Sequence, residues 1–230
     1  MTADGPYLAI DTATTRVVVA VGGSDGRPAA GAEWRAGYHH GQLLLESVAR
    51  VLAQAGVGRL DLAGVLVGTG PGAFTGLRVG LATAKALAHA LDRPIVGVPT
   101  GEALLAAFAR TEAVDPGCLA LLLPAGPADR VLVRPGEAAR LLPGGSEPPL
   151  PADAIVLALD LPGRAPDDAL ARGERAFAGL AGELLRAGGT RLAAGAADDL
   201  ARLVPEYVTL PRGVRAATGE VRWSHDRPSS

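Results

Sequence analysis

The chain is poor in residues that several protein classes depend on. Its single cysteine, Cys118, excludes a disulfide within the chain, and the apolar run around it indicates a buried small side chain. Aromatic residues make up only 3% of the 230 residues, too few for the stacking surfaces that bind single-stranded nucleic acids. The formal net charge of −2 provides no excess of basic residues, so we expect no direct binding of a nucleic acid.

Long apolar runs are also missing. No run approaches the roughly 20 residues that a helix needs to cross a bilayer. The first residues lack the basic-then-apolar pattern of a signal peptide. We therefore expect no membrane contact and a cytoplasmic location. The chain is instead 48% hydrophobic, which is enough for the core of one large domain or two smaller lobes.

The most informative stretch covers residues 64–91. The run Val65-Leu-Val predicts a buried strand, and a glycine-dense turn follows it. Apolar residues at helical spacing then predict a helix that begins near Leu77 and ends at Leu91, with Thr75 as its N-cap. The stretch therefore reads as a strand, a turn and a helix.

The glycine turn matches neither common phosphate-binding motif. A P-loop requires Gly-Lys-Ser/Thr, and this chain has Gly76-Leu-Arg. Gly68, Gly70 and Ala73 have the spacing of a dinucleotide fingerprint, but the helix begins several residues too late for one. The turn alone therefore predicts no nucleotide cofactor.

The remaining elements follow from the same kinds of pattern. The first half is predicted to hold strands over residues 7–11, 16–22, 29–35 and 95–98, a helix over 40–55, and a helix over 100–110 capped by Thr100. The second half is predicted to hold strands over 118–123, 131–133 and 154–159, helices over 169–187 and 193–203, and an irregular excursion over 134–153. An opening meander followed by a helix and another strand fits a ribonuclease-H-like α/β lobe.

Polar residues follow the first strand. Asp11, Thr12, Thr14 and Thr15 lie where ATPases of this fold place a magnesium-managing carboxylate and a phosphate-contacting hairpin. The structural alternative is that these side chains bond to turn amides, and we favour it for this chain. No lysine suited to holding phosphate and no set of metal carboxylates accompanies them.

One string is specific enough to indicate a family. Gly68-Thr-Gly-Pro-Gly-Ala-Phe-Thr-Gly-Leu-Arg-Val-Gly closely resembles the signature of the TsaB (YeaZ) family. Three other motifs agree in order: Leu8-Ala-Ile-Asp-Thr-Ala-Thr, His40 opening a leucine-rich helix, and Pro94-Ile-Val-Gly-Val-Pro-Thr. The late Pro205-Glu-Tyr-Val is similar to the family's Pro-x-Tyr-Leu ending. The signature positions of the turn are Gly68, Gly70, Pro71, Gly72, Phe74, Thr75, Gly76 and Arg78.

The resemblance implies an actin-like, sugar-kinase-like ATPase fold with two lobes, the second of them reduced. We expect the first lobe over residues 1–112, the second over 113–215, and a disordered tail over 216–230. The second lobe departs from the family, because Pro124-Ala-Gly-Pro-Ala-Asp-Arg-Val-Leu replaces the usual Asp-Ala-Arg-x-Gly-Glu-Val-Tyr hairpin. This loss of acidic and aromatic residues puts a nucleotide contact there in doubt.

The family is the non-catalytic dimerisation subunit of the bacterial machinery that forms N6-threonylcarbamoyladenosine in tRNA, at the adenosine next to the anticodon. The resemblance implies a TsaD-type catalytic partner, self-pairing through the same helices, a TsaE-type ATPase, and only indirect contact with tRNA. The positions that we expect at the partner interface are His40, Leu43, Leu44, Ser47, Arg50, Gly80, Ala84, Lys85 and Ala88. No cofactor is expected for this chain itself, although the resemblance allows ATP or ADP to bind at the partner interface.

The residue pattern also argues against a metal site. The catalytic sister family, TsaD, carries a pair of metal-binding histidines on the corresponding helix, whereas Leu43 and Leu44 stand four residues after His39 and His40 here. The rival hypothesis is a small-molecule kinase or ATPase that uses Asp11 and the glycine turn. For the non-catalytic subunit, Asp11 and Thr12 are the positions of a vestigial nucleotide contact. A peptidase has no support, since no Gly-x-Ser-x-Gly or His-Glu-x-x-His motif is present.

Overall fold

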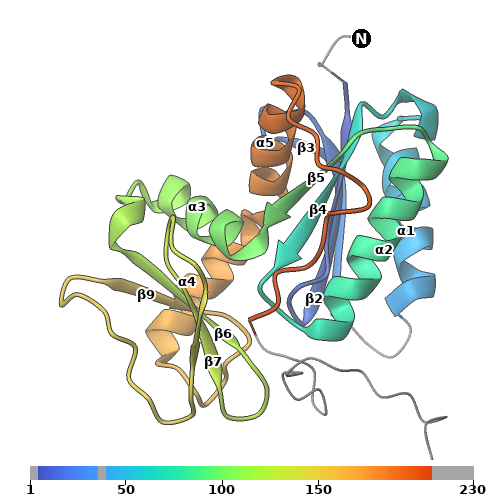
Figure 1. Cartoon of the computed structure of the whole chain (residues 1–230). Helices are drawn as coiled ribbons and strands as arrows, with labels where there is room; N and C mark the ends of the chain where they lie inside the picture. Colours follow the sequence, from blue (N-terminus) through green and yellow to red (C-terminus); the bar gives the residue numbers. More distant parts are fainter. Residues whose placement is uncertain (1–4, 36–39, 209–230) are drawn as a thin grey trace, which may run out of the picture.

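Two β-sheets form the framework of the chain (Figure 1). The computed structural model describes residues 5–35 and 40–208, with backbone alone for 40–42. The first sheet has the strand order β3-β2-β1-β4-β5. Its strands are β1 (Tyr7–Asp11), β2 (Arg16–Gly22), β3 (Pro28–Arg35), β4 (Gly64–Gly70) and β5 (Ile95–Pro99). β1, β2 and β3 form an antiparallel meander, and β4 and β5 continue the sheet parallel to β1, as expected for a ribonuclease-H-like lobe.

Helices cover both faces of the first sheet, which explains why β1 and β4 are buried along their whole length. Helices α1 (His40–Ala55) and α2 (Phe74–Ala90) lie side by side on one face, with the short turn η1 (Arg59–Asp61) between α1 and β4. Helices α3 (Thr100–Glu112) and α5 (Leu180–Ala193) pack on the other face. This three-layer arrangement confirms the α/β class.

The second sheet is smaller and has the order β8-β7-β6-β9. Its strands are β6 (Leu119–Pro124), β7 (Arg130–Val133), β8 (Arg140–Leu142) and β9 (Ile155–Ala158), preceded by the turn η2 (Pro116–Cys118). Helix α4 (Asp167–Ala178) packs against β9 and α3. One face of this sheet shares a hydrophobic core with α3 and α5, and the other has a small core of its own.

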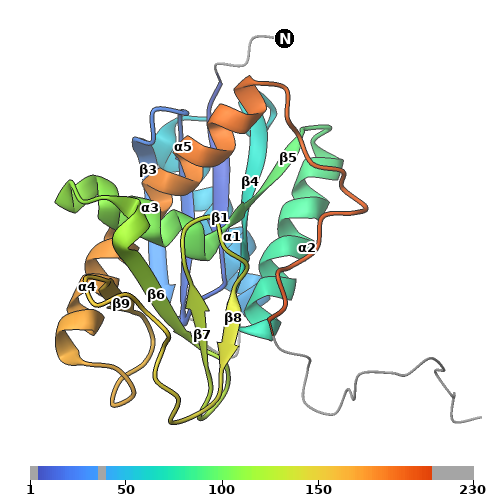
Figure 2. The same ribbon diagram turned by 60° about the vertical axis from the view of Figure 1, so that its left-hand side comes forward.

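Several sequence-based boundaries are wrong. The stretch 169–187 is two helices, because the chain turns at Gly179 between α4 and α5. α5 then packs on the first sheet, although its residues were expected in the second lobe (Figure 2). No helix forms over 193–203, and the excursion 134–153 contains strand β8. Cys118 is half-buried in η2 and is not a strand residue.

The expected helix caps are also corrected. α2 begins at Phe74 with Ala73 as its N-cap, so Thr75 lies inside the first turn. α3 begins at Thr100 itself, after Pro99. The Thr100 hydroxyl bonds across the sheet to Asp11, and this tertiary contact replaces a local cap.

Residues 194–208, the C-terminal segment, run along the exposed edge of the first sheet toward the start of α2 (Figure 2). Asp198 pairs with Ile95 and accepts a hydrogen bond from the backbone N–H of Gly97 at 2.8 Å. Arg191 donates to the Gly97 carbonyl and to Asp198, each at 2.8 Å. The edge of β5 is therefore closed to pairing with another chain at this point.

None of the described helices is long and apolar enough to cross a membrane. The tail expected over 216–230 and the side chain of His40 lie outside the described residues. The division between lobes at 112/113 stays a prediction.

Candidate functional site: the glycine turn and the cleft between the lobes

The glycine turn after β4 wraps closely around the β1–β2 connection. The backbone N–H of Ala73 donates to the Ala13 carbonyl at 2.7 Å, and the Thr12 hydroxyl donates to the Gly76 carbonyl at 2.7 Å. A Cβ added at Gly72 would lie 2.0 Å from the Ala13 carbonyl oxygen. Any side chain at Gly72 would therefore collide with the Ala13 backbone, so the two backbones can approach each other this closely only with glycine at this position.

Asp11 is the buried carboxylate at the centre of this contact. Its side chain has no exposed surface. One oxygen accepts from the Ala13 N–H at 2.8 Å, and the other accepts from the Thr100 hydroxyl at 2.7 Å. Thr100 in turn accepts from the Gly70 N–H at 3.1 Å. Asp11 therefore ties β1 to the glycine turn and to the start of α3.

Burial decides the ionisation of Asp11. Removal from water raises the pKa of its carboxyl from 3.8 to about 6, although the hydrogen bonds from Thr100 and Ala13 oppose the shift. A Cβ at Gly68 would lie 1.8 Å from an Asp11 oxygen, which shows how closely β4 covers the carboxylate. These contacts favour the structural interpretation of Asp11 over a magnesium-binding one.

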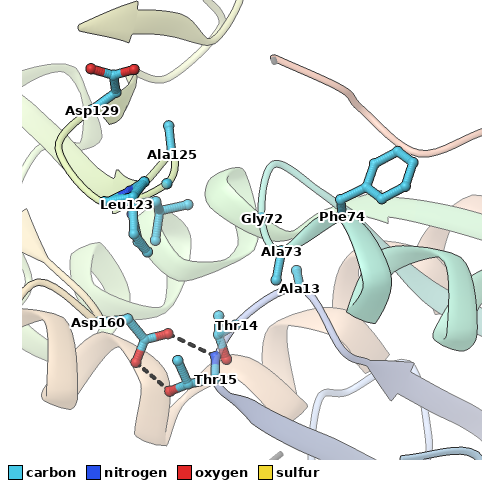
Figure 3. Close-up of a pocket in the computed structure, with 13 residues that line it drawn as sticks. Ala13, Thr14, Thr15, Gly72, Ala73, Phe74, Leu123, Ala125, Asp129 and Asp160 are labelled. Atoms are coloured by element: carbon cyan, nitrogen blue, oxygen red, sulfur yellow. Dashed lines mark hydrogen bonds between the residues drawn. The ribbon is translucent and has the colours of Figure 1, made fainter. Parts of the chain in front are cut away.

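A cleft of about 560 Å³ lies between the two sheets (Figure 3). The β1–β2 connection and the start of α2 line one side, and the β6–β7 hairpin and the loop after β9 line the other. Asp160, in that loop, accepts from the Thr15 N–H at 2.8 Å and from the Thr15 hydroxyl at 2.5 Å (Figure 3). Asp11 does not line the cleft, and the described lining residues include no lysine, arginine or histidine.

Two family-like motifs that are distant in sequence meet at the start of α2. The Tyr207 ring packs on the Phe74 ring with centroids 5.1 Å apart, and the Arg78 guanidinium lies 4.3 Å from the Phe74 centroid. The Glu206 N–H donates to the Thr69 carbonyl at 2.8 Å. The C-terminal segment therefore fastens onto the glycine turn.

The expected partner positions on α1 and α2 divide into two groups. Leu44, Ser47, Gly80, Ala84 and Ala88 are buried inside the chain itself. These positions are expected at a partner interface, but they are buried within the chain and offer almost no surface.

The accessible group is smaller. Leu43 is 45% exposed, Arg50 is exposed and Lys85 is half-buried. Arg50 donates to the Ser47 hydroxyl at 3.2 Å. Leu45, which is 53% exposed, lies on the opposite flank of the same helix, because residues two apart are about 200° apart around a helix.

The sequence reasoning missed Asp160 and Asp129 as cleft residues. A usable signal was present, since Asp160 opens the turn Asp-Leu-Pro-Gly directly after an apolar strand. No group of three or more metal-ligating side chains occurs among residues 5–35 and 40–208.

Comparison with known proteins agrees with the family resemblance. The profile of the family described as "TsaD: tRNA N6-adenosine threonylcarbamoyltransferase" matches residues 35–207, which is more than half of the chain. The tRNA threonylcarbamoyladenosine biosynthesis protein TsaB of Escherichia coli is 39% identical over 93 residues, which are 40% of this chain and 39% of that protein. An uncharacterized protein of Mycobacterium leprae is 42% identical over 100 residues, covering 42% of this chain and 28% of that protein. These matches therefore span well under half of the curated relatives.

Solved structures resemble a larger part of the chain. YeaZ from Pseudomonas aeruginosa is 26% identical with a TM-score of 0.64, covering 88% of this chain and 99% of that one. The crystal structure of an uncharacterized protein with similarity to peptidase YeaZ, from the same organism, is 27% identical with a TM-score of 0.67. It covers 89% of this chain and 100% of that one. The chain belongs to the TsaD family of proteins and, within it, to the TsaB (YeaZ) branch.

Proposed function

We propose that this chain is a non-catalytic subunit that binds a TsaD-type threonylcarbamoyltransferase and supports formation of N6-threonylcarbamoyladenosine in tRNA. The names of its relatives support the pathway, since both a TsaB protein and the threonylcarbamoyltransferase family match it. The chain supplies a binding surface, and the partner supplies the chemistry.

The observation that carries the proposal is the enclosure of Asp11. Both of its oxygens are bonded inside the chain, and its side chain has no exposed surface. A carboxylate that manages magnesium needs oxygens free to face a metal-bound phosphate. Because both Asp11 oxygens already accept hydrogen bonds from Ala13 and Thr100, Asp11 is not available to bind magnesium in a kinase or ATPase mechanism. The Thr12 hydroxyl is likewise bonded to the Gly76 carbonyl.

We assign the partner surface to one flank of α1 and the adjoining part of α2. The flank consists of Leu43, Arg50 and Gln54, which are seven and four residues apart and so lie along one line of the helix. An exposed leucine in line with an arginine suits a protein interface, where arginine is enriched and glutamate is depleted. Lys85 of α2 is the other expected position that stays accessible.

The same surface is proposed for self-pairing, and the other expected associations belong to the assembled complex. Two copies of the chain can pair through it when the partner is absent, and the partner then displaces one copy. A TsaE-type ATPase and ATP or ADP belong to the assembled complex, and tRNA reaches this chain through the partner. The net charge of −2 agrees with indirect contact.

Co-purification with a TsaD-type protein tests this assignment. Leu43→Asp is expected to abolish the complex, because it places an unpaired charge in an apolar contact. Leu45→Asp is the matched control: it has similar exposure, lies on the same helix and faces the opposite flank. Loss of the complex only with Leu45→Asp would move the interface to the other flank, and retention with both variants would overturn the proposal.

The non-catalytic role has a separate test. In a reconstituted tRNA modification reaction with its partner proteins, Asp11→Asn is expected to keep most of the activity once folding is verified. A loss of turnover with the complex intact would restore the enzyme hypothesis.

A further inference from the structure

The C-terminal segment carries an exposed aromatic side chain in a chain that has few aromatic residues. Tyr7, Phe108 and Phe177 are buried in the core, whereas Tyr207 is 42% exposed. Its ring packs on the half-buried ring of Phe74 at the start of α2, with the centroids 5.1 Å apart. Aromatic side chains are enriched at protein interfaces, so a ring pair left at the surface suits a binding surface.

Arg78 joins these two rings to form the aromatic cluster (Phe74, Arg78 and Tyr207). Its guanidinium lies 4.3 Å from the Phe74 centroid, at an exposed position of α2. It forms no ion pair with any residue in 5–35 and 40–208, so its donors are available to a carboxylate of another molecule. Figure 3 shows the Phe74 ring directed away from Thr15 and Asp160, so the cluster does not face the cleft.

The aromatic cluster adjoins the surface proposed for the partner. Arg78 and Lys85 are seven residues apart and so lie along one line of α2. α1 leads to the start of β4 and α2 follows its end, so the two helices run side by side in the same direction (Figure 1). Leu43, in the first turn of α1, therefore lies at the same end of the helix pair as Phe74.

The chain's own contacts hold Tyr207 in place. Leu200 and Leu203 of the C-terminal segment pack against the core beneath α1 and α2. The Glu206 N–H, next to Tyr207, donates to the Thr69 carbonyl at 2.8 Å. The ring is therefore positioned before any partner arrives, which reduces the entropy lost on binding.

We propose that the aromatic cluster forms one edge of the surface that binds the TsaD-type partner, and that the C-terminal segment contributes Tyr207 directly to this interface. The two rings supply apolar contact area, and Arg78 pairs with an acidic group of the partner. This inference rests on the proposed function, because it extends the surface around Leu43. It gives the C-terminal segment a second role besides closing the edge of β5.

Calorimetric titration of the TsaD-type partner tests the inference on the full chain. Tyr207→Ala and Arg78→Ala are each expected to weaken binding at least about tenfold, whereas Tyr207→Phe keeps the ring and is expected to stay within about threefold of the native affinity. Leu141→Ala is the matched control, since Leu141 is also 42% exposed but belongs to β8 of the second sheet. It is expected to bind like the native chain.

Photo-crosslinking separates direct contact from an indirect effect on the C-terminal segment. The photoreactive residue p-benzoylphenylalanine at position 207 is expected to give a covalent product with the partner, and the same residue at position 141 is expected to give none. Products formed only with a second copy of this chain, or only with residues 209–230 of the same chain, would overturn the inference.

The titration also distinguishes this inference from the proposed function. Native affinity in Tyr207→Ala and Arg78→Ala, with binding lost in Leu43→Asp, would overturn the role of the aromatic cluster and leave the proposed function standing. Native affinity in all three variants would overturn both.

Discussion

The inner and outer surfaces of the α1–α2 pair have opposite roles. Leu44, Gly80 and Ala84 are sealed against the chain's own sheet and hairpin, whereas Leu43, one residue from Leu44, is 45% exposed. The pair therefore separates two kinds of position: the inner face holds the fold together, and the outer face carries the surface that we propose for the partner. A substitution on the inner face tests folding, and a substitution on the outer face tests the proposed interface.

The largest difference between the two faces is expected for neighbouring leucines. Leu44→Ala removes a side chain that is 1% exposed and leaves a cavity between α1 and the sheet. It should lower the free energy of unfolding by about 3 kcal/mol, whereas Leu43→Ala should cost less than about 1 kcal/mol. Chemical denaturation of both variants measures the contrast, and similar losses would mean that α1 is rotated from the orientation described.

The buried carboxylate of Asp11, which bonds to the start of α3 on the other face of the sheet from α1 and α2, predicts a pH dependence. The pKa of Asp11 is about 6 in the folded chain and 3.8 as its ordinary value, so the folded state binds more protons between these pH values. The free energy of unfolding should therefore fall as pH rises from 4 to 6, by ~3 kcal/mol from this group in total, and stay low above pH 6.

Asp11→Asn isolates this contribution because its amide oxygen can keep the Ala13 bond while carrying no charge. Denaturation of the native chain and the variant at pH 4 and pH 7 should show the variant gaining relative stability at the higher pH. A constant difference across that range would show that Asp11 is not desolvated as described.

The smallest effect on the inner face is expected at Gly80. A Cβ there would lie 2.1 Å from the Thr12 hydroxyl oxygen, which must shift away from its bond to Gly76. Overpacking costs ~2–3 kcal/mol, and alanine returns about 1 kcal/mol through its better helix propensity, so Gly80→Ala should cost about 1–2 kcal/mol. Ala82→Leu on the exposed side of α2 is the control and should change stability by less than about 0.5 kcal/mol. A stabilised Gly80→Ala variant would mean that the hairpin does not press on α2.

The sequence allowed the first lobe to be predicted better than the second, for a physical reason. β1, β5 and α1 carry apolar patterns that local rules read directly, and their bounds agree with prediction within about one residue. The break at Gly179 and the return of α5 to the first sheet depend on tertiary packing that no local pattern encodes. Strand β8 was missed because three residues in a proline- and glycine-rich stretch give too little alternation to detect.

The candidate site follows the same rule. The glycine turn was recognisable because its close contacts require glycine at fixed positions. The expected partner positions on α1 and α2 include both buried and exposed residues, because the apolar stripe of α1 is wide. The sequence alone does not show which of its leucines faces the sheet. Thr75 and Thr100 were assigned as caps because local propensity says nothing of the bond from Thr100 to Asp11 across 89 residues.

The central claim is that the outer flank of α1 binds a TsaD-type partner while Asp11 serves only the fold. Calorimetric titration of that partner with the native chain, Leu43→Asp and Asp11→Asn tests both halves in one measurement. The account predicts that Asp11→Asn binds within about threefold of the native chain, and that Leu43→Asp binds at least about a hundredfold more weakly, as expected for a central interface residue. Native affinity in Leu43→Asp, with binding lost in a folded Asp11→Asn, would contradict it.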